Sequence, residues 1–168
     1  MMTTYDFHDG NGPVPAHQHR NPDGRVGGWV ADTAQVSGEA RVFGKARVYG
    51  QARVFGEAQV SGEAWVSDEA QVSGEARVYG QAQVSGEAWV SGEAWVETTP
   101  ISIIGLPYRV TISDKHIQIG CLQLTFAQFS SFTATRAEHA DGAQAVEFFT
   151  AYWPALQLLI DRHKKGAP

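Results

Sequence analysis

Tryptophan and arginine recur in the middle of the chain at positions separated by multiples of six residues. Arginine donates bidentate, charge-assisted hydrogen bonds to phosphate, and a tryptophan ring stacks on a base or against a cation. These residue types in one regular slot therefore indicate a surface that binds a small phosphorylated ligand. The candidate ligand-binding residues are Trp29, Arg41, Arg47, Trp65, Arg77 and Trp95, together with Tyr79.

The same residues permit other interpretations. Tryptophan and arginine dominate the hot spots of protein–protein interfaces, so they can equally pack one subunit against the next. A surface of this kind can also bind a peptide or a sugar, and the spacing alone does not choose among these ligands. The interface and the ligand site are compatible if the ligand lies in a groove between subunits.

Residues that could carry catalysis are sparse. The six histidines of the chain are His8, His17, His19, His116, His139 and His163. None of them lies in the part of the chain that carries the Trp/Arg slot, so no general base is available there. Cys121 follows an apolar, strand-like run, which favours a small buried side chain over a nucleophile. We therefore predict a non-catalytic protein that uses no cofactor.

His17 and His19 lie two residues apart, a spacing at which both could ligate a metal from one face of a strand. Asp23 and His8 are the nearby residues that could complete such a site. Because neither follows a metal-binding spacing, we favour a surface or capping role for the two histidines and predict no bound metal.

A six-residue repeat must position the Trp/Arg slot. Valine recurs without a break every six residues from Val30 to Val96, usually with alanine two residues before it and glycine two residues after it. Alanine and valine two apart point to the same side of a strand, which predicts an Ala/Val interior. Glycine supplies the positive φ of a turn, and Asp32 and Asp68 replace it in two repeats.

Three such sides close a triangular coil of 18 residues, so residues 29–97 form about four coils. Reading every 18 residues places Trp29, Arg47 and Trp65 on one face of this prism and Arg41, Arg77 and Trp95 on another. The glutamates at the turns are expected to face solvent.

Runs such as VSGEARVFGKARVYGQARVFGEAQV resemble the hexapeptide-repeat family. The resemblance implies a left-handed parallel β-helix and, as in the acyltransferases of that family, a trimer with its ligands in clefts between subunits. The flanking segments GNGPVPAHQH, GGWVADTA and ISDKHIQIGC resemble small hexapeptide-repeat proteins encoded by phages and prophages.

The sequence divides into an N-terminal arm or cap at 1–28, the β-helix at 29–97 and a C-terminal α+β cap at 98–168. In the cap, strands are predicted at 101–104, 108–112 and 116–119. Thr125 can cap a short helix, and Asp141 a longer one that starts at Gly142 and kinks or restarts at Pro154. The predicted fold class is thus mainly β, a left-handed parallel β-helix of about four triangular coils with a small C-terminal α+β cap.

The composition excludes some partners. The net charge is −5 and the pI about 5.6, which argues against binding duplex nucleic acid through its phosphates. No segment approaches the ~18 apolar residues of a membrane helix, so no membrane partner is expected. The first residues lack the features of a signal peptide, which favours a cytoplasmic location, in the host if the protein is phage-encoded.

These features and the resemblance together predict a homotrimeric, non-catalytic protein that binds a small phosphorylated ligand between its subunits. For a phage-encoded protein, we expect this ligand to be a (cyclic) nucleotide immune signal that the protein sequesters. One alternative is a hexapeptide-repeat acyltransferase, which a histidine or a long loop within the coils would have favoured. A second alternative is a structural or adaptor component of a phage particle, from which more coils and uncapped ends would be expected.

Overall fold

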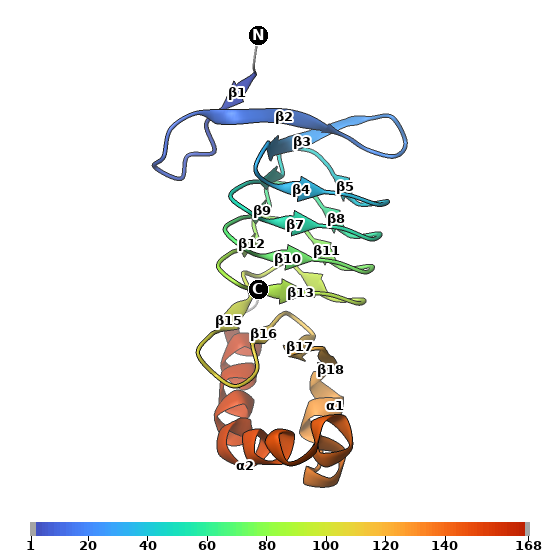
Figure 1. The fold of residues 1–168 in the computed structure, drawn as a ribbon, viewed down its shortest axis with the longest axis vertical. Coiled ribbons are helices and arrows are strands. Elements are labelled where there is room, and N and C mark those ends of the chain that lie inside the picture. Colours follow the sequence, from blue (N-terminus) through green and yellow to red (C-terminus); the bar gives the residue numbers. More distant parts are fainter. Residues whose placement is uncertain (1–2, 167–168) are drawn as a thin grey trace.

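The computed structural model describes residues 3–166, with side chains up to Lys164, and shows a three-sided prism between two unlike ends (Figure 1). The strand β3 (Val26–Ala31) opens the first coil, and two-residue strands follow, one for each six-residue repeat. They are β4 (Gln35–Val36), β5 (Arg41–Val42), β6 (Arg47–Val48), β7 (Arg53–Val54), β8 (Gln59–Val60), β9 (Trp65–Val66), β10 (Gln71–Val72), β11 (Arg77–Val78), β12 (Gln83–Val84), β13 (Trp89–Val90) and β14 (Trp95–Val96).

These strands stack into three parallel sheets, one on each side of the prism. The first face carries β3, β6, β9 and β12, the second face β4, β7, β10 and β13, and the third face β5, β8, β11 and β14. Paired residues are 18 positions apart, so Arg47 lies between Trp29 and Trp65. The predicted 18-residue coil and its three columns of outward side chains are confirmed.

The interior of the prism consists of the alanines and valines of the repeat. From Ala40 to Val96 they are no more than 2% exposed. The turn glycines from Gly38 to Gly92 have φ between 61° and 73°, and Asp68 has φ 57°, as the repeat predicts. Asp32 was wrongly expected to adopt the same conformation, because its backbone N–H is instead held by the Pro15 carbonyl of the N-terminal segment.

The N-terminal segment forms a strand hairpin over the first coil. β1 (Thr4–Tyr5) and β2 (Val14–Arg20) extend the first face in antiparallel fashion, with β2 paired to β3. The Asn21 amide donates to the Val42 carbonyl at 3.0 Å and accepts from the Val42 N–H at 2.8 Å. Both groups belong to an otherwise unpaired edge of the prism, so this end is capped.

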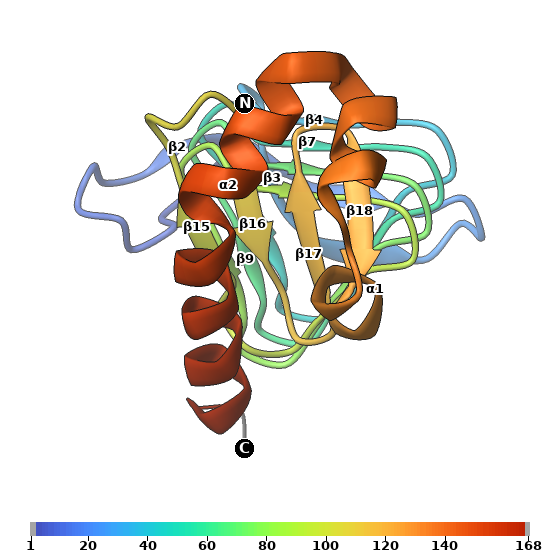
Figure 2. The same cartoon turned by 90° about the horizontal axis from the view of Figure 1, so that it is seen from below.

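The C-terminal part is a four-stranded antiparallel sheet with helices packed on it (Figure 2). Its strands are β15 (Ile101–Ile103), β16 (Val110–Ile112), β17 (His116–Ile119) and β18 (Leu122–Thr125), and its helices are α1 (Phe126–Ser130) and α2 (Ala134–Gly166). Thr125 caps α1 as predicted, and it does so in a capping box with Gln128, whereas β18 was not expected. The fold class is confirmed as mainly β, with a prism of about four turns and a C-terminal cap.

The helix expected from Gly142 onward is present in the cap, because α2 consists of two helices that meet at the non-helical residues Asp141 and Gly142. The shorter helix that begins at Ala134 was not expected, and the described part of α2 has no break at Pro154, where one was expected. Gly142 has φ 62° and so provides the break without a Cβ penalty. Cys121 is exposed rather than buried, because it lies in the turn between β17 and β18. No helix within residues 3–166 is both long and apolar enough to cross a membrane.

Candidate ligand-binding site

The candidate residues lie on two different faces of the prism. The first face brings Trp29, Arg47 and Trp65 into one column. The third face stacks Arg77 on Trp95, whereas Gln59 separates Arg41 from Arg77. The candidates therefore form two separate groups, and Arg41 stands apart from both.

Arg47 is the centre of the first group. Its guanidinium carbon lies 5.0 Å from the Trp65 ring centroid and 6.0 Å from that of Tyr5. One guanidinium nitrogen donates to the Phe7 carbonyl at 3.3 Å, and the buried Nε has no hydrogen-bond partner among the described residues. The side chain is thus held in place by aromatic rings while donor capacity remains unused.

The N-terminal hairpin covers the upper part of this column. The Tyr5 ring stacks on Trp29 with a centroid separation of 4.4 Å, and Phe7 stacks on Tyr49 at 4.9 Å. One face of the Trp29 ring is therefore occupied by the protein itself. Tyr5 and Phe7 were not singled out in the sequence, since nothing in the repeat signals what the preceding segment will cover.

A hollow of about 340 Å³ lies beside Arg47 and Trp65. It is lined by Lys45, Arg47, Glu63, Trp65, Gln81 and Gln83, which come from three successive coils. Its volume is at the lower end of the ~300–1,000 Å³ typical of small-molecule sites. Lys45 donates to Glu63 at 2.9 Å, and this hydrogen bond lowers the pKa of the Glu63 carboxyl.

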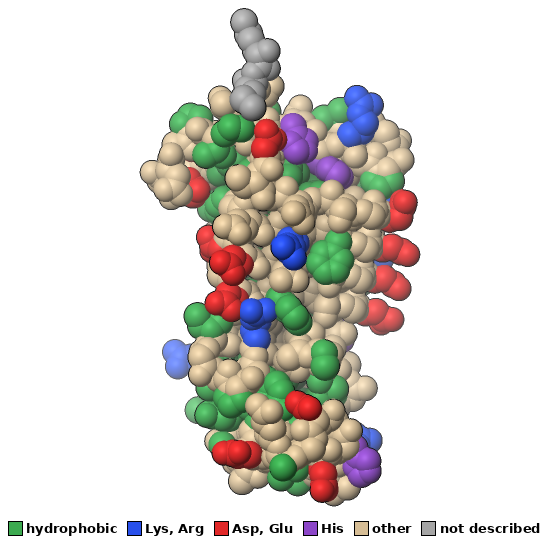
Figure 3. All heavy atoms as spheres, in the orientation of Figure 1, with side chains coloured by type: hydrophobic (Ala, Val, Ile, Leu, Met, Phe, Trp, Pro, Cys, Tyr) green, Lys and Arg blue, Asp and Glu red, His purple; other side chains and the backbone are tan. Residues whose placement is uncertain are grey.

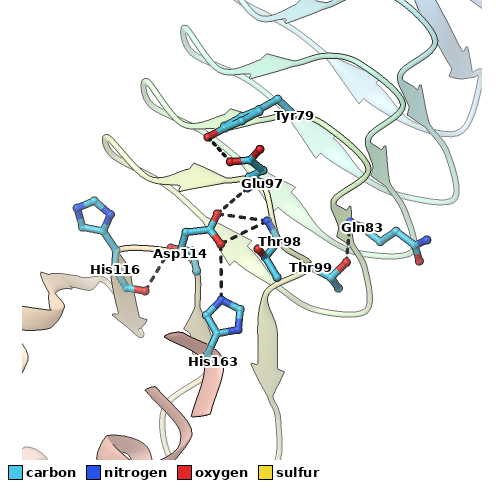
Figure 4. Close-up of polar contacts among 9 residues, drawn as sticks. Tyr79, Gln83, Glu97, Thr98, Thr99, Asp114, His116 and His163 are labelled. Atoms are coloured by element: carbon cyan, nitrogen blue, oxygen red, sulfur yellow. Dashed lines mark hydrogen bonds and ion pairs between the residues drawn. The ribbon is translucent and has the colours of Figure 1, made fainter. Parts of the chain in front are cut away.

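The second group, on the third face, has more acidic surroundings (Figure 4). Arg77 and Lys115 lie 5.4 Å and 5.1 Å from the Trp95 ring centroid. The Tyr79 hydroxyl donates to Glu97 at 3.3 Å, and burial followed by the charge of Glu97 raises the Tyr79 pKa. A phosphate here would meet the carboxylate of Glu97, whereas the Glu63 carboxylate beside Arg47 is already paired with Lys45. This group therefore suits an anion less well than the first face does.

Asp114 lies at the same end of the prism and joins it to the C-terminal cap. Its carboxylate accepts hydrogen bonds from the backbone N–H groups of Glu97 and Thr98, the first at 2.6 Å. The buried His163 of α2 lies 3.8 Å from Asp114 (Figure 4). These contacts satisfy the backbone of the last coil, which is a capping role.

The second face exposes basic and hydrophobic side chains, beside an edge lined with acidic ones (Figure 3). Phe55 is 38% exposed there, and Arg109 of the cap lies 4.8 Å from the Trp89 ring. Arg109 also pairs with Glu87 at 2.7 Å, so this turn glutamate does not simply face solvent. Arg109 was missed because it lies outside the repeat.

His17 and His19 lie on β2 at the N-terminal end. His17 Nδ1 is 2.9 Å from an Asp32 carboxylate oxygen. Burial lowers the pKa of the His19 imidazole, and the nearby Ala40 backbone partly offsets this shift. Within residues 3–166, no three His, Cys, Asp or Glu side chains are grouped so that they could hold a metal ion.

Comparison with known proteins agrees with the architecture of the prism. A family model described as the YdcK β-solenoid repeat matches residues 34–50 and 70–86. The centre of this chain is a β-solenoid repeat. Searches of curated proteins and of solved structures found no significant match. The family match therefore concerns the stacked coils, and it assigns no chemistry to the side chains that line the hollow.

Proposed function

We propose that this solenoid protein is a non-catalytic module that binds a small phosphorylated ligand in the hollow beside Arg47. The observation that carries the proposal is the Arg47 guanidinium, which is stacked on Trp65 at the wall of the hollow and whose one hydrogen bond among the described residues goes to the Phe7 carbonyl. A guanidinium has five N–H donors, so most of its donor capacity is unused. A phosphate oxygen in the hollow would accept from the guanidinium N–H groups that line it.

The other lining residues suit a nucleotide better than inorganic phosphate. Lys45 adds a second cation, and its partner Glu63 adds the single carboxylate of the lining. The Trp65 indole offers a surface for a base, and the amides of Gln81 and Gln83 can donate to or accept from its polar edge. Phosphate and base are thereby recognised by different side chains.

We further propose that the protein is a homotrimer in which a neighbouring subunit closes the hollow. Support comes from the large apolar side chains that the solenoid leaves exposed, Phe55 at 38% and Trp95 at 41%, and from the resemblance to hexapeptide-repeat trimers. In a phage-encoded protein, such a site would sequester a (cyclic) nucleotide immune signal in the host cytoplasm and return it unchanged.

Calorimetry against a panel of linear and cyclic nucleotides tests the proposal. Arg47→Ala should weaken binding by about 10–150-fold, equivalent to about 1.5–3 kcal/mol, and reduce the salt dependence of what remains. Trp65→Ala should cost a similar amount, with the salt dependence of the native protein retained. Mass spectrometry of the released ligand should find it chemically intact.

The matched control is Arg53→Ala on the second face, which removes the same charge away from the hollow and should leave affinity unchanged. Arg47→Met keeps much of the packing on Trp65 and separates loss of binding from loss of fold. The proposal fails if no nucleotide binds, or if Arg53→Ala weakens binding as much as Arg47→Ala does.

The hexapeptide acyltransferase remains the second candidate because of one contact. The bond between His17 and Asp32 at 2.9 Å orients the imidazole in the way a general base requires. Transfer of the acyl group from an acyl-coenzyme A to an added amine or alcohol acceptor, with release of free coenzyme A, would favour this activity over simple binding if it is lost in His17→Gln.

A further inference from the structure

The C-terminal cap contains a second cavity, which shares no lining residue with the hollow beside Arg47. Its volume is about 230 Å³, and its walls are mostly apolar. We propose that this cavity binds a small aromatic molecule that carries a neutral or cationic hydrogen-bond donor, such as the N–H of an indole. This proposal does not depend on the proposed function of the solenoid.

The break in α2 creates the cavity. At Asp141 and Gly142 the helix leaves helical geometry, and residues on both sides of the break line the cavity. Ala137 lies before the break and Ala145 after it, and both present only a methyl group to the space. Larger side chains at these two positions would fill it.

Aromatic rings form much of the wall. Phe149 lies 4.6 Å from Trp153, and Tyr108 lies 5.1 Å from Phe148 in an edge-to-face arrangement. All four rings line the cavity. Apolar cavities of this kind bind small aromatic molecules, which pack against such rings by stacking and edge contacts.

Tyr108 and Asp141 form a polar rim at the cavity and determine which polar group the ligand can carry. The Tyr108 hydroxyl donates to an Asp141 carboxylate oxygen at 2.5 Å, and this hydrogen bond is the main cause that raises the Tyr108 pKa to about 12. The tyrosine proton is thus already committed to Asp141 at neutral pH. The remaining lone pairs of both groups only accept, so the ligand must bring the donor, and a ligand carboxylate would be repelled by Asp141.

Cys121 provides a reporter at the same cavity. It is the only cysteine in the chain, it is exposed, and it lines the cavity. A molecule seated against the aromatic wall would cover this thiol. Its alkylation rate therefore reports occupancy without relying on the heat of binding.

The test uses the full-length protein with indole, toluene and benzoate as probes, in calorimetry and in iodoacetamide alkylation of Cys121. We expect indole to bind with one-to-one stoichiometry and to slow alkylation. Toluene, which lacks a donor, should bind about tenfold more weakly, and benzoate should neither bind nor protect the thiol.

Two variants separate the wall from the rim. Ala145→Leu should fill the cavity and weaken indole binding at least about tenfold, whereas Ala143→Leu, at an exposed position outside the lining, should not. Asp141→Asn removes the charge but keeps an acceptor oxygen, so it should allow benzoate to bind while indole stays preferred over toluene.

The proposal is overturned if indole produces neither heat nor protection of Cys121, or if Ala145→Leu folds and binds indole as the native protein does. Self-association that disappears in Ala145→Leu would also overturn it, because the cavity would then be an interface. If Ala145→Leu does not fold, the probe preferences of Asp141→Asn decide the outcome.

Discussion

Ala64 and Trp65 are neighbours in the chain but lie in opposite environments. Ala64 is fully buried in the core of the prism, and Trp65 faces the hollow beside Arg47. The alternation of a strand separates them, so one position of each repeat sets stability while the next sets surface chemistry. This division of roles can be measured by placing the same new side chain at each kind of position.

Ala64→Leu should overpack the narrow interior and lower the free energy of unfolding by about 1–3 kcal/mol or more. Gln51→Leu introduces the same side chain at an exposed turn position and should change the free energy of unfolding by less than about 0.5 kcal/mol. Urea denaturation of both variants measures these values. Equal effects would show that the inward and outward assignments are wrong.

At the scale of elements, the turns decide how closely the coils can stack. Each turn glycine adopts a positive φ, and those from Gly38 to Gly74 lie over the corresponding residue of the next coil. A Cβ at Gly74 would lie 2.9 Å from the Gly92 nitrogen, whereas a Cβ at Gly86 would meet nothing within 4 Å. The two positions have φ of 66° and 64°, so they differ in crowding and not in conformation.

Gly74→Ala should therefore destabilise the protein more than Gly86→Ala does. Both substitutions incur the conformational cost of a positive φ, about 1–2 kcal/mol, and only Gly74→Ala also forces neighbouring coils apart. Thermal melts of the two variants give the comparison. If Gly86→Ala lowered the melting temperature more than Gly74→Ala did, close stacking of the turns would not explain the need for glycine at position 74.

The ends of the solenoid contain two half-buried imidazoles. Burial lowers the pKa of His19 on β2 and of His116 on β17, and His116 also lies near Glu93 and Lys115, which act in opposite directions. A lowered folded-state pKa means that the unfolded chain binds protons more readily than the folded protein. Stability is thus full above the ordinary histidine pKa of about 6.5 and falls as the pH drops from there toward the folded-state values.

We expect the urea concentration at the unfolding midpoint to decrease as the pH is lowered from 7.5 to 5. His19→Gln and His116→Gln should each make this decrease smaller. His139→Gln is the matched control, because His139 is exposed on α2, away from both half-buried imidazoles. If the urea midpoint of the double variant His19→Gln/His116→Gln decreased with pH as much as that of the native protein, the acid sensitivity would belong to other groups.

At the scale of the whole molecule, charge and apolar surface lie on different parts of the solenoid. Glu39, Glu57, Glu75 and Glu93 are all exposed, at intervals of 18 residues, and so form a column along one edge, where Figure 3 shows acidic side chains. An interface along this edge would bring like charges together. The exposed Phe55 and Trp95 lie on the second and third faces, which favours assembly through the faces.

Light scattering at micromolar concentration should give a mass about three times the 18.2 kDa of one chain. Phe55→Glu or Trp95→Glu should reduce it toward that of the monomer, and the more damaging variant identifies the interface. Leu158→Glu is the control, since Leu158 is 69% exposed on α2 of the cap. A stable monomer of the native protein would exclude the interface interpretation of the tryptophans.

The sequence by itself determined the solenoid. Its period, the inward Ala/Val pairs, the turns at glycine and Asp68 and the columns joining Trp29 to Arg47 and Trp65 all follow from a local rule. Because every coil obeys that rule, backbone hydrogen bonds carry the register from one coil to the next. The candidate residues could therefore be assigned to faces without any knowledge of the remaining chain.

Only the tertiary structure decided which of those residues remain uncovered and free to contact a ligand or a partner. Tyr5 covers Trp29, Arg109 covers Trp89, and the break at Asp141 opens a cavity far from the repeat. Each of these features joins segments that share no period, so their contacts depend on side-chain packing between distant parts of the chain. The pattern of a single segment cannot specify such contacts, because they arise from the fit of two surfaces and not from the local conformation of either.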